Sequence, residues 1–460
     1  MPRFRPHKMY PGALLAQECC SYQASTQLLM RMSGRMAVIV HSDRDCSNVL
    51  PKTGGFLHAP DGYRFFCTNM KEDELVTGQG NAKLRRAIEL VHAAQQPDLI
   101  IVLATCPTVM IGDNVKNVVR KAGKDLGVNA VAEMTNGLRP KSPAEVVDDL
   151  YSLLCRGARA AAPEVDRARR INLVGMQLAP PERAEIEATL TAMGLTVNVV
   201  LNEESSLDQF LGVAAAQWNA HPGPHLMLNF DEQCRQKFSQ RPIEVPLPFG
   251  VDATDRFYHA IGAAVGVDAA AIDAATAGGR VAAAGAVADY RTRWGERIRK
   301  EKGRAPRCAF NIGSVRSFDL RRIAHEEMGE LPLFDELGVE CQLFIQGPQD
   351  DANRQRTAGV LAELGVRHPF VIFPDPGSLA KHLRPGQFDV FVGADFLADE
   401  LSKVNLPLFE KAQLGLGYGA ARFNLEYLDG AIFQSFYRHF RPSPETERRP
   451  AAEAVPCSKS

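Results

Sequence analysis

The chain has 460 residues, which at ~100 to 200 residues per domain predicts about three domains with cores of their own and excludes a small stapled scaffold. Hydrophobic residues make up 45% and charged residues 23%, the balance of a globular protein. The formal net charge of -1 argues against a nucleic-acid partner, because phosphate contacts need a basic surface. No apolar stretch reaches the ~18 to 20 residues of a membrane span, so we expect no membrane partner.

The N-terminal segment does not have the pattern of a secretion signal. It is basic, but its apolar run at 12–16 is short and leads into Gln17 and Glu18. We therefore expect a cytoplasmic protein. Its 10 cysteines are then expected to be reduced, as core residues, reactive thiols or metal ligands.

From Met36 onward, short β-rich runs alternate with helical periodicity, which favours parallel sheets covered by helices. In the first third we predict strands at 37–41, 99–104 and 129–134, and helices at 81–94 and 115–126, the latter with Asp113 as N-cap. A second unit begins after Arg170, with a strand ending at Leu228, and 263–288 is predicted as bridging helices. A third begins at Arg307, with a helix at 318–328.

The predicted fold class is therefore α/β, with three Rossmann-like domains built on parallel sheets. We place an N-terminal cluster-binding domain at 1–165, a middle domain with the bridging helices at 166–300, and a C-terminal domain at 301–440. The segment 441–460 is rich in proline and charge, and we predict a disordered tail.

The run Gly415 to Ala420 formally satisfies the GxGxxG/A dinucleotide pattern, but such a loop must follow a buried strand. The residues before it, 409–414, are charged and not strand-like, so the sequence favours a glycine-rich turn. No Walker A lysine, GxSxG or HExxH motif is present. Conventional nucleotide and hydrolase chemistry is not supported.

Three cysteines follow or end β-rich runs in the first unit: Cys46, Cys67 and Cys106. The carboxyl ends of parallel strands share one edge of a sheet, so the three thiols could meet there. Thiolates are the standard protein ligands of iron-sulfur clusters, but three are one short of a complete cubane set. The alternative is that each cysteine is a small buried hydrophobe, because free cysteine is among the most buried residue types.

The remaining cysteines carry a weaker signal. Apolar or helical surroundings favour core positions for four of them: Cys155, Cys234, Cys308 and Cys341. Cys457 lies in the tail, and we expect it to be inert. Cys19 and Cys20 are adjacent and either line a cluster cavity or serve local packing, with packing favoured.

Three segments together resemble the nitrogenase component 1 family. They are His41-Ser42-Asp43-Arg44-Asp45-Cys46, the stretch from Cys67 through Met70 and Glu72 to Gly78, and Thr105-Cys106 followed by Ile111-Gly112-Asp113-Asn114. These are similar to the family signatures H-G-x-x-G-C, [ST]-x-M-x-E-x-x-x-x-x-G-G and T-C-x-x-x-x-I-G-D-[DN]. The sequence departs from them at Ser42, Asp45 and Gln79, where glycines are usual.

The resemblance implies that Cys46, Cys67 and Cys106 bind a P-cluster-like iron-sulfur cluster shared with a partner subunit. It also implies an α-like partner of the same family, an ATP-dependent iron-sulfur reductase protein as electron donor, and a heterotetramer with two copies of each subunit. No histidine lies between Val404 and Phe433, where an α-type half would hold its catalytic cofactor. The run 246–257 is similar to the β-type half, which we therefore expect here.

The expected function is that of a β-type subunit of a nitrogenase-like reductase. It would relay low-potential electrons to a cofactor in the α-like partner, with dinitrogen, a tetrapyrrole or a methylthio-alkane as substrate. We favour reductive C-S cleavage of methylthio-alkanes. The rival hypothesis is a non-catalytic scaffold for assembly of a complex iron-sulfur cofactor, and a third is an α/β sugar or nucleotide enzyme with core cysteines.

Overall fold

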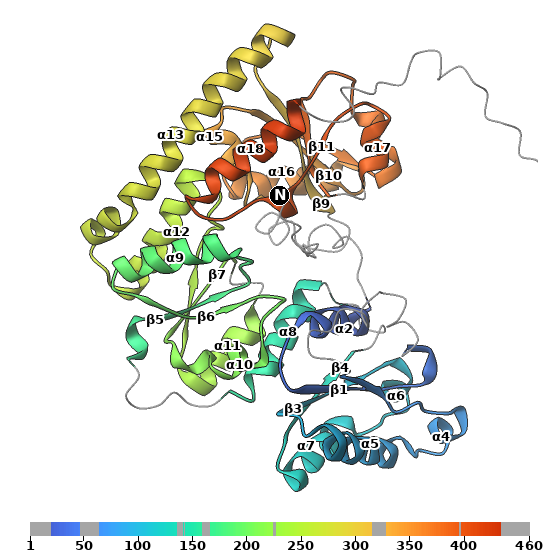
Figure 1. Ribbon diagram of the computed structural model, residues 1–460. Helices are drawn as coiled ribbons and strands as arrows, with labels where there is room; N and C mark the ends of the chain where they lie inside the picture. Colours follow the sequence, from blue (N-terminus) through green and yellow to red (C-terminus); the bar gives the residue numbers. More distant parts are fainter. Residues whose placement is uncertain are drawn as a thin grey trace, which may run out of the picture.

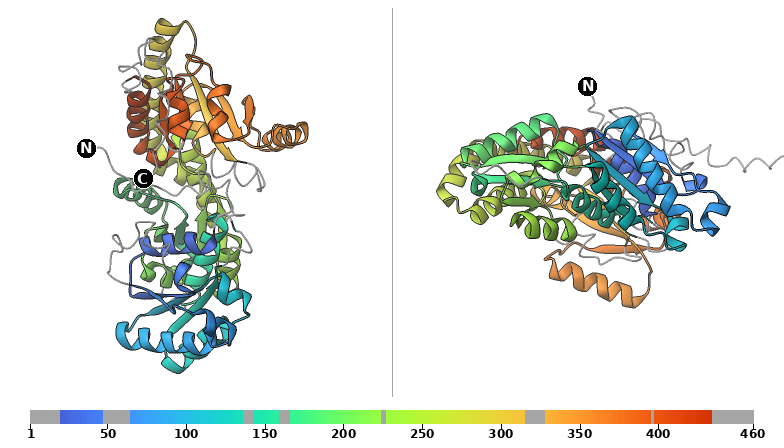
Figure 2. Two further views of the ribbon diagram at one scale, coloured as in Figure 1. Left: turned by 90° about the vertical axis from the view of Figure 1, so that its right-hand side faces the viewer. Right: turned by 90° about the horizontal axis from the view of Figure 1, so that it is seen from below.

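Three α/β units follow one another along an elongated molecule, each built on one parallel sheet (Figures 1 and 2). The structure, a computed structural model, describes residues 20–46, 64–135, 141, 143–158, 166–223, 227–314, 328–394 and 397–433. All strand pairings within these ranges are parallel, as the sequence predicted. Among the same residues, no helix combines the length and the apolar character that a membrane span requires.

The first unit has the strand order β2-β1-β3-β4. Its elements in chain order are α2 (Ser21–Arg31), β1 (Met36–His41), β2 (Phe65–Cys67), α4 (Glu72–Val76), α5 (Gly80–Gln95), β3 (Leu99–Ala104), α6 (Cys106–Met110), α7 (Val115–Leu126), β4 (Asn129–Met134) and α8 (Pro143–Cys155).

The two central strands of this unit, β1 and β3, are buried along their whole length. Alternate residues face opposite sides: Ile39 and Val102 pack with α5 and α7, whereas Val40 and Leu103 pack with α2 and α8. Burying each such side chain contributes roughly 1.5 to 3 kcal/mol. The continuous apolar runs AVIV and LIIVL thus encode strands that are covered on both faces.

The second unit has the strand order β6-β5-β7-β8. Its elements are β5 (Arg170–Val174), α9 (Pro180–Ala192), β6 (Thr196–Leu201), α10 (Leu207–Leu211), β7 (Trp218–His221), α11 (Leu228–Phe238), β8 (Arg241–Glu244), α12 (Gly250–Val265) and α13 (Ala269–Lys302). Helix α13 also packs on α18 of the next unit, which confirms the predicted bridging helices (Figure 1).

The third unit has the strand order β11-β10-β9-β12-β13. Its elements are β9 (Arg307–Ser314), α15 (Leu331–Glu336), β10 (Glu340–Gln346), α16 (Asp351–Glu363), β11 (Phe370–Phe373), β12 (Val390–Gly393), α17 (Ala398–Ser402), β13 (Leu408–Glu410) and α18 (Ala420–Phe433). Each predicted domain range contains one sheet. The boundaries at 165 and 300 remain a proposal, and α13 crosses the second of them.

Three carboxylates join neighbouring units by accepting two backbone N–H bonds each at the N-terminus of a helix. Asp148 of α8 accepts from the start of α11 at 2.9 and 2.8 Å. Glu336 of α15 accepts from the start of α12 at 2.9 and 2.8 Å. Glu185 of α9 accepts from Tyr418 and Gly419, just before α18, at 2.8 and 2.6 Å. The contacts between units are therefore polar and directional as well as apolar.

Several local predictions need correction. A strand ending at Leu228 is wrong, because α11 begins there and the strand is β7. Helix α7 has the predicted bounds, but its N-cap is Asn114 with no side-chain cap bond, because Asp113 is hydrogen-bonded to His41 instead. The predicted helix at 318–328 falls almost wholly outside the described residues, and the tail at 441–460 lies outside them entirely.

Candidate iron-sulfur site

Strand register brings the three predicted cysteine segments to one edge of the first sheet. In the parallel ladder, Val40 pairs with Cys67, and His41 pairs with Ala104. Cys46 follows β1, Cys67 ends β2, and Cys106 begins α6 directly after β3. Because β2 and β3 lie on opposite sides of β1, the ends of β1 and β3 form a topological switch point, where open α/β sheets bind ligands.

Hydroxyl groups tie the first and third segments together. The Thr105 hydroxyl donates to the Ser42 hydroxyl oxygen at 2.6 Å, and the Cys46 N–H donates to the Asp43 carboxylate at 3.3 Å. Burial raises the pKa of the Cys46 thiol, and hydrogen bonds with Ser42 and Thr105 oppose that shift. Cys106 lies within electrostatic range of the same thiol. This pair of thiols is therefore half-buried in a polar setting, unlike a core pair.

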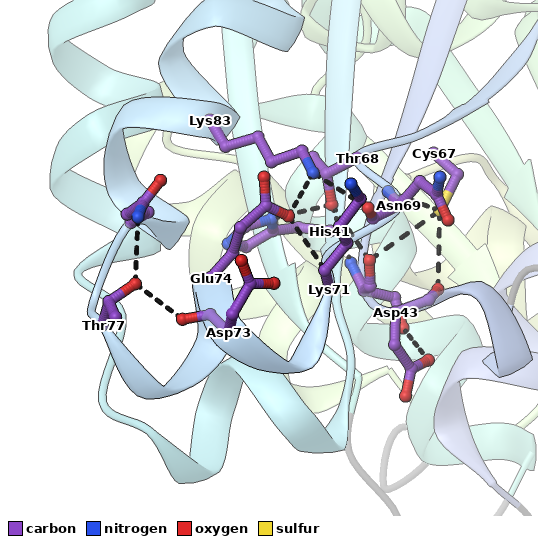
Figure 3. Close-up of polar contacts among 12 residues, drawn as sticks. His41, Asp43, Cys67, Thr68, Asn69, Lys71, Asp73, Glu74, Thr77 and Lys83 are labelled. Atoms are coloured by element: carbon purple, nitrogen blue, oxygen red, sulfur yellow. Dashed lines mark hydrogen bonds and ion pairs between the residues drawn. The ribbon is translucent and has the colours of Figure 1, made fainter.

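The Cys67 segment is held by a polar network shown in Figure 3. The Cys67 sulfur accepts from the Asn69 N–H at 3.2 Å and lies 3.6 Å from the Asp43 carbonyl oxygen. Asn69 has φ 49°, the left-handed region that asparagine tolerates. Lys83 of α5 donates to the Asn69 carbonyl at 2.9 Å and pairs with Glu74 of α4. The loop is thus fixed by charges from both flanking helices.

A buried pair lies beneath these loops. His41 is fully buried, with Nδ1 3.1 Å from the Thr68 hydroxyl and Nε2 3.1 Å from the Asp113 carboxylate. Burial lowers the pKa of the imidazole, against the opposing hydrogen bond to Asp113. The neutral ring then donates Nε2–H to Asp113 and accepts the Thr68 proton at Nδ1.

The Tyr22 hydroxyl supplies a test of whether the site fits a bound cluster. It is buried and has no hydrogen-bond partner among the described residues. Burial raises its pKa, and so do Cys46, Cys67 and Cys20, so these thiols surround it within electrostatic range. A buried polar atom without a partner beside soft sulfur donors fits a bound iron-sulfur group that would accept its proton.

The spacing of the donors also bears on the type of metal site. No three His, Cys, Asp or Glu side chains of the described residues are placed to hold a single metal ion. A cluster differs from a single ion because each thiolate binds a different iron atom, and the ligands are spread around it. The residues present therefore fit a cluster better than a mononuclear site.

Sequence reasoning undervalued Cys20. It is exposed at the start of α2, and the Tyr22 hydroxyl links it electrostatically to Cys46 and Cys67. Its position before an amphipathic helix gave no sign of this, because α2 reaches the sheet edge only through tertiary packing. Cys19 and Cys457 lie outside the described residues.

Four cysteines are buried core residues, as predicted, and they form two contacting pairs. Cys155 of α8 contacts Cys234 of α11, and Cys308 of β9 is paired in register with Cys341 of β10. Burial, followed by the neighbouring thiol, raises the pKa of Cys155 and of Cys308 far above the ordinary value. These thiols are suited to packing and not to iron binding.

The glycine-rich loop has a different context from the predicted one. It does follow a short strand, β13, and it does precede a helix, α18. However, the amides of Tyr418 and Gly419 already donate to the Glu185 carboxylate. A carboxylate from the neighbouring unit occupies the anion position, so the loop serves as an interdomain contact, in agreement with the predicted structural turn.

Known proteins share this chain's sequence over part of its length. A family model described as "Nitrogenase component 1 type Oxidoreductase" matches residues 20–299. The chain is 26% identical over 258 residues to "Nitrogenase iron-molybdenum cofactor biosynthesis protein NifE" of Nostoc sp., covering 56% of this chain and 53% of the relative. It is 31% identical over 138 residues to "Nitrogenase molybdenum-iron protein alpha chain" of Methanosarcina barkeri, covering 29% and 26%.

A third relative is one component of the light-independent protochlorophyllide reductase of Heliobacterium modesticaldum, 22% identical over 240 residues and covered over 48% of this chain and 45% of its own. The matches span about half or less of these relatives. The solved structure "Nitrogenase Cp1 at pH 5" superposes with a TM-score of 0.66 at 16% identity, covering 96% of this chain and 92% of that one, which shows a shared fold. The matched family model spans more than half of the chain, which therefore belongs to the nitrogenase component 1 type oxidoreductases.

Proposed function

We propose that this chain is the β-type subunit of a nitrogenase-like reductase and relays low-potential electrons through an iron-sulfur cluster bound by Cys46, Cys67 and Cys106. The observation that carries the proposal is the gathering of these thiols at one sheet edge around the unpartnered Tyr22 hydroxyl. When bound, such a cluster supplies a one-electron carrier.

The protein's own residues would prepare the thiols for iron. Thiolates are the binding form, so the elevated pKa of Cys46 means that its proton leaves as the metal binds. The N–H bond from Asn69 to the Cys67 sulfur favours the thiolate at that position. Three thiols from one chain leave a cubane set incomplete, which supports a P-cluster-like cluster shared with an α-like partner.

The β-type assignment rests on where cofactor ligands are missing in this chain. Cys234, the one cysteine in the relevant part of the middle unit, is fully buried against Cys155 and cannot reach a cofactor without opening the core. No histidine occurs between Val404 and Phe433. We therefore assign the catalytic cofactor to an α-like partner, in a cytoplasmic heterotetramer with two copies of each subunit.

Exposed apolar side chains beside the site suit a protein partner. Val76, at the end of α4, is 87% exposed, and Met110, at the end of α6, is 69% exposed. Both helices come directly from the cysteine segments, and exposed apolar side chains around a site favour partner binding. We assign this surface to the ATP-dependent iron-sulfur reductase protein that supplies electrons. As substrate we favour a methylthio-alkane, cleaved reductively at its C-S bond.

One observation favours a second candidate. The relative named for iron-molybdenum cofactor biosynthesis matches over 56% of this chain, a longer stretch than the alpha-chain match of 29%. A non-catalytic scaffold for assembly of a complex iron-sulfur cofactor would use the same thiols to hold a cluster in transit. Turnover by the purified complex separates the two: a reductase consumes substrate with an electron donor, whereas a scaffold releases its cluster to an acceptor protein.

The cysteines test the proposal directly. In the complex purified with its partner, Cys67→Ala and Cys106→Ala should each abolish the EPR signal of the cluster and lower iron and sulfide together. The control Cys155→Ala, in the buried pair, should leave iron unchanged. Cys20→Ala shows whether the fourth thiol at this edge is also a ligand. Equal iron content in Cys67→Ala, Cys106→Ala and Cys155→Ala would refute the site.

A further inference from the structure

The His41 imidazole joins two of the three cysteine segments through its two ring nitrogens. Nδ1 contacts the hydroxyl of Thr68, the residue after Cys67, at 3.1 Å (Figure 3). Nε2 contacts the carboxylate of Asp113, in the loop after α6, at 3.1 Å. The His41 and Asp113 side chains are 0% and 4% exposed, so water does not compete for either bond.

The backbone around His41 binds the same segments. The His41 carbonyl accepts from the Thr108 hydroxyl of α6 at 2.9 Å. The Thr68 hydroxyl accepts from the Ser42 N–H at 3.0 Å. The end of β1, the end of β2 and the start of α6 are therefore cross-linked at one point, directly beneath the thiols. A shift of any one segment has to break at least one buried hydrogen bond.

Asp113 is itself held in place from the far side. It lies against Gly80, the first residue of α5, where a Cβ would come within 2.0 Å of the Asp113 Oδ2 atom. The neighbouring Asn114 N–H donates to the Asn81 side-chain oxygen at 2.9 Å. The close approach places a carboxylate at a helix N-terminus, where the helix dipole stabilises negative charge. Only glycine at position 80 leaves room for it.

We propose that the buried His41–Asp113 pair is a positioning device that sets the spacing of the Cys46, Cys67 and Cys106 segments, and with it the retention of the cluster. Neither side chain binds iron. This inference rests on the proposed function, because it assigns the pair to a cluster at those cysteines. Partners that orient metal ligands from behind typically change metal affinity by about 10- to 100-fold when replaced.

A second buried His–Asp pair in the chain supplies a matched control. His221 ends β7 of the middle unit, and its Nε2 lies 2.8 Å from the Asp231 carboxylate. Its side chain is 1% exposed and that of Asp231 is 13% exposed. It has the same chemistry at the end of a parallel strand, but in a different unit from the proposed ligands.

The test compares Asp113→Asn, Gly80→Ala and the control Asp231→Asn in the full chain purified with its partner. Asp113→Asn removes the charge at nearly constant shape, whereas Gly80→Ala keeps the charge and displaces it. Iron release to an added chelator should become about tenfold faster in the first two variants and stay unchanged in the control. Hydrogen exchange of backbone amides should rise at 41–46, 67–70 and 105–114 in the first two variants only.

Equal iron release in Asp113→Asn and Asp231→Asn overturns the proposal, and so does unchanged exchange in the three segments. If the wild-type complex contains no iron, the proposed function fails, and hydrogen exchange then decides on the positioning device alone. Increased exchange confined to those segments would still support it, and increased exchange spread over the whole chain would overturn it.

Discussion

Asp148 shows how burial and hydrogen bonding compete at a single residue. It is 5% exposed and accepts two backbone N–H bonds from the start of α11. Those bonds favour the charged form, yet desolvation is the larger effect and raises the pKa from 3.8 to about 6. A carboxyl group with an elevated pKa in the folded state binds its proton more tightly there than in the unfolded chain. Its stabilising contribution is therefore complete below about pH 4 and is lost as the pH rises through 6.

We predict that the free energy of unfolding of the native chain falls relative to Asp148→Asn by about 2 kcal/mol between pH 4 and pH 7. Asparagine keeps the shape and one acceptor oxygen but does not titrate. Denaturant unfolding of both chains at several pH values measures the difference. The control Asp125→Asn, at a side chain that is 58% exposed, should show no such trend. A difference that is constant across pH would contradict the prediction.

At the scale of elements, Glu185 decides what the glycine-rich loop does. The strand β13, the loop and the helix α18 follow one another as in a dinucleotide site, and their free amides would suit a phosphate. Glu185 of α9 supplies the negative charge from within the chain and leaves those amides paired. Tyr418 of the same loop stacks on Tyr258 of α12, with ring centroids 5.8 Å apart. The loop therefore joins two units.

Removing this carboxylate should weaken the contact between the units. We predict that Glu185→Ala lowers the free energy of unfolding by about 1 to 3 kcal/mol, because two backbone amides lose their acceptor. Glu187, on the same helix, forms only an exposed ion pair with Arg183, so Glu187→Ala should change stability by less than about 0.5 kcal/mol. Thermal unfolding of both variants measures this. Equal effects would show that the loop amides find other partners.

The whole molecule places its reactive edge at one end and its largest core at the other. The largest apolar cluster spans the middle and C-terminal units and includes residues of α12, α13 and α18. A smaller cluster connects the first unit to the middle one through α2, α8 and α11. The thiol edge therefore stands on a rigid base, while its outer helices α4 and α6 carry the exposed Val76 and Met110.

At this scale we predict that Val76→Lys and Met110→Lys slow reduction of the complex by its iron-sulfur donor protein by about tenfold, a loss of about 1.4 kcal/mol in association. Each places a charge in an apolar contact. Reduction by dithionite, which needs no docking, should be unchanged. Val281→Lys is the control, because Val281 is 72% exposed on α13, in another unit. If the control slows reduction equally, the assigned surface is wrong.

The sequence by itself determined the class of fold and the order of its elements, because apolar runs and helical periodicity are local signals that burial then reinforces. Helix α7 and strands β4 and β11 have the predicted bounds. Local chemistry also singled out Cys46, Cys67 and Cys106, since each stands next to a β-rich run.

Only the tertiary structure decided which groups meet. Asp113 has the composition of a helix cap, but a buried imidazole from β1 offers a stronger partner than the exposed start of α7. The strand β13 was missed because its three residues carry no periodic pattern, and its pairing with β12 defines it. Cys20 and Tyr22 join the thiol edge because α2 packs across the sheet. Contacts between residues far apart in the chain depend on the packing of whole elements, and no local pattern records them.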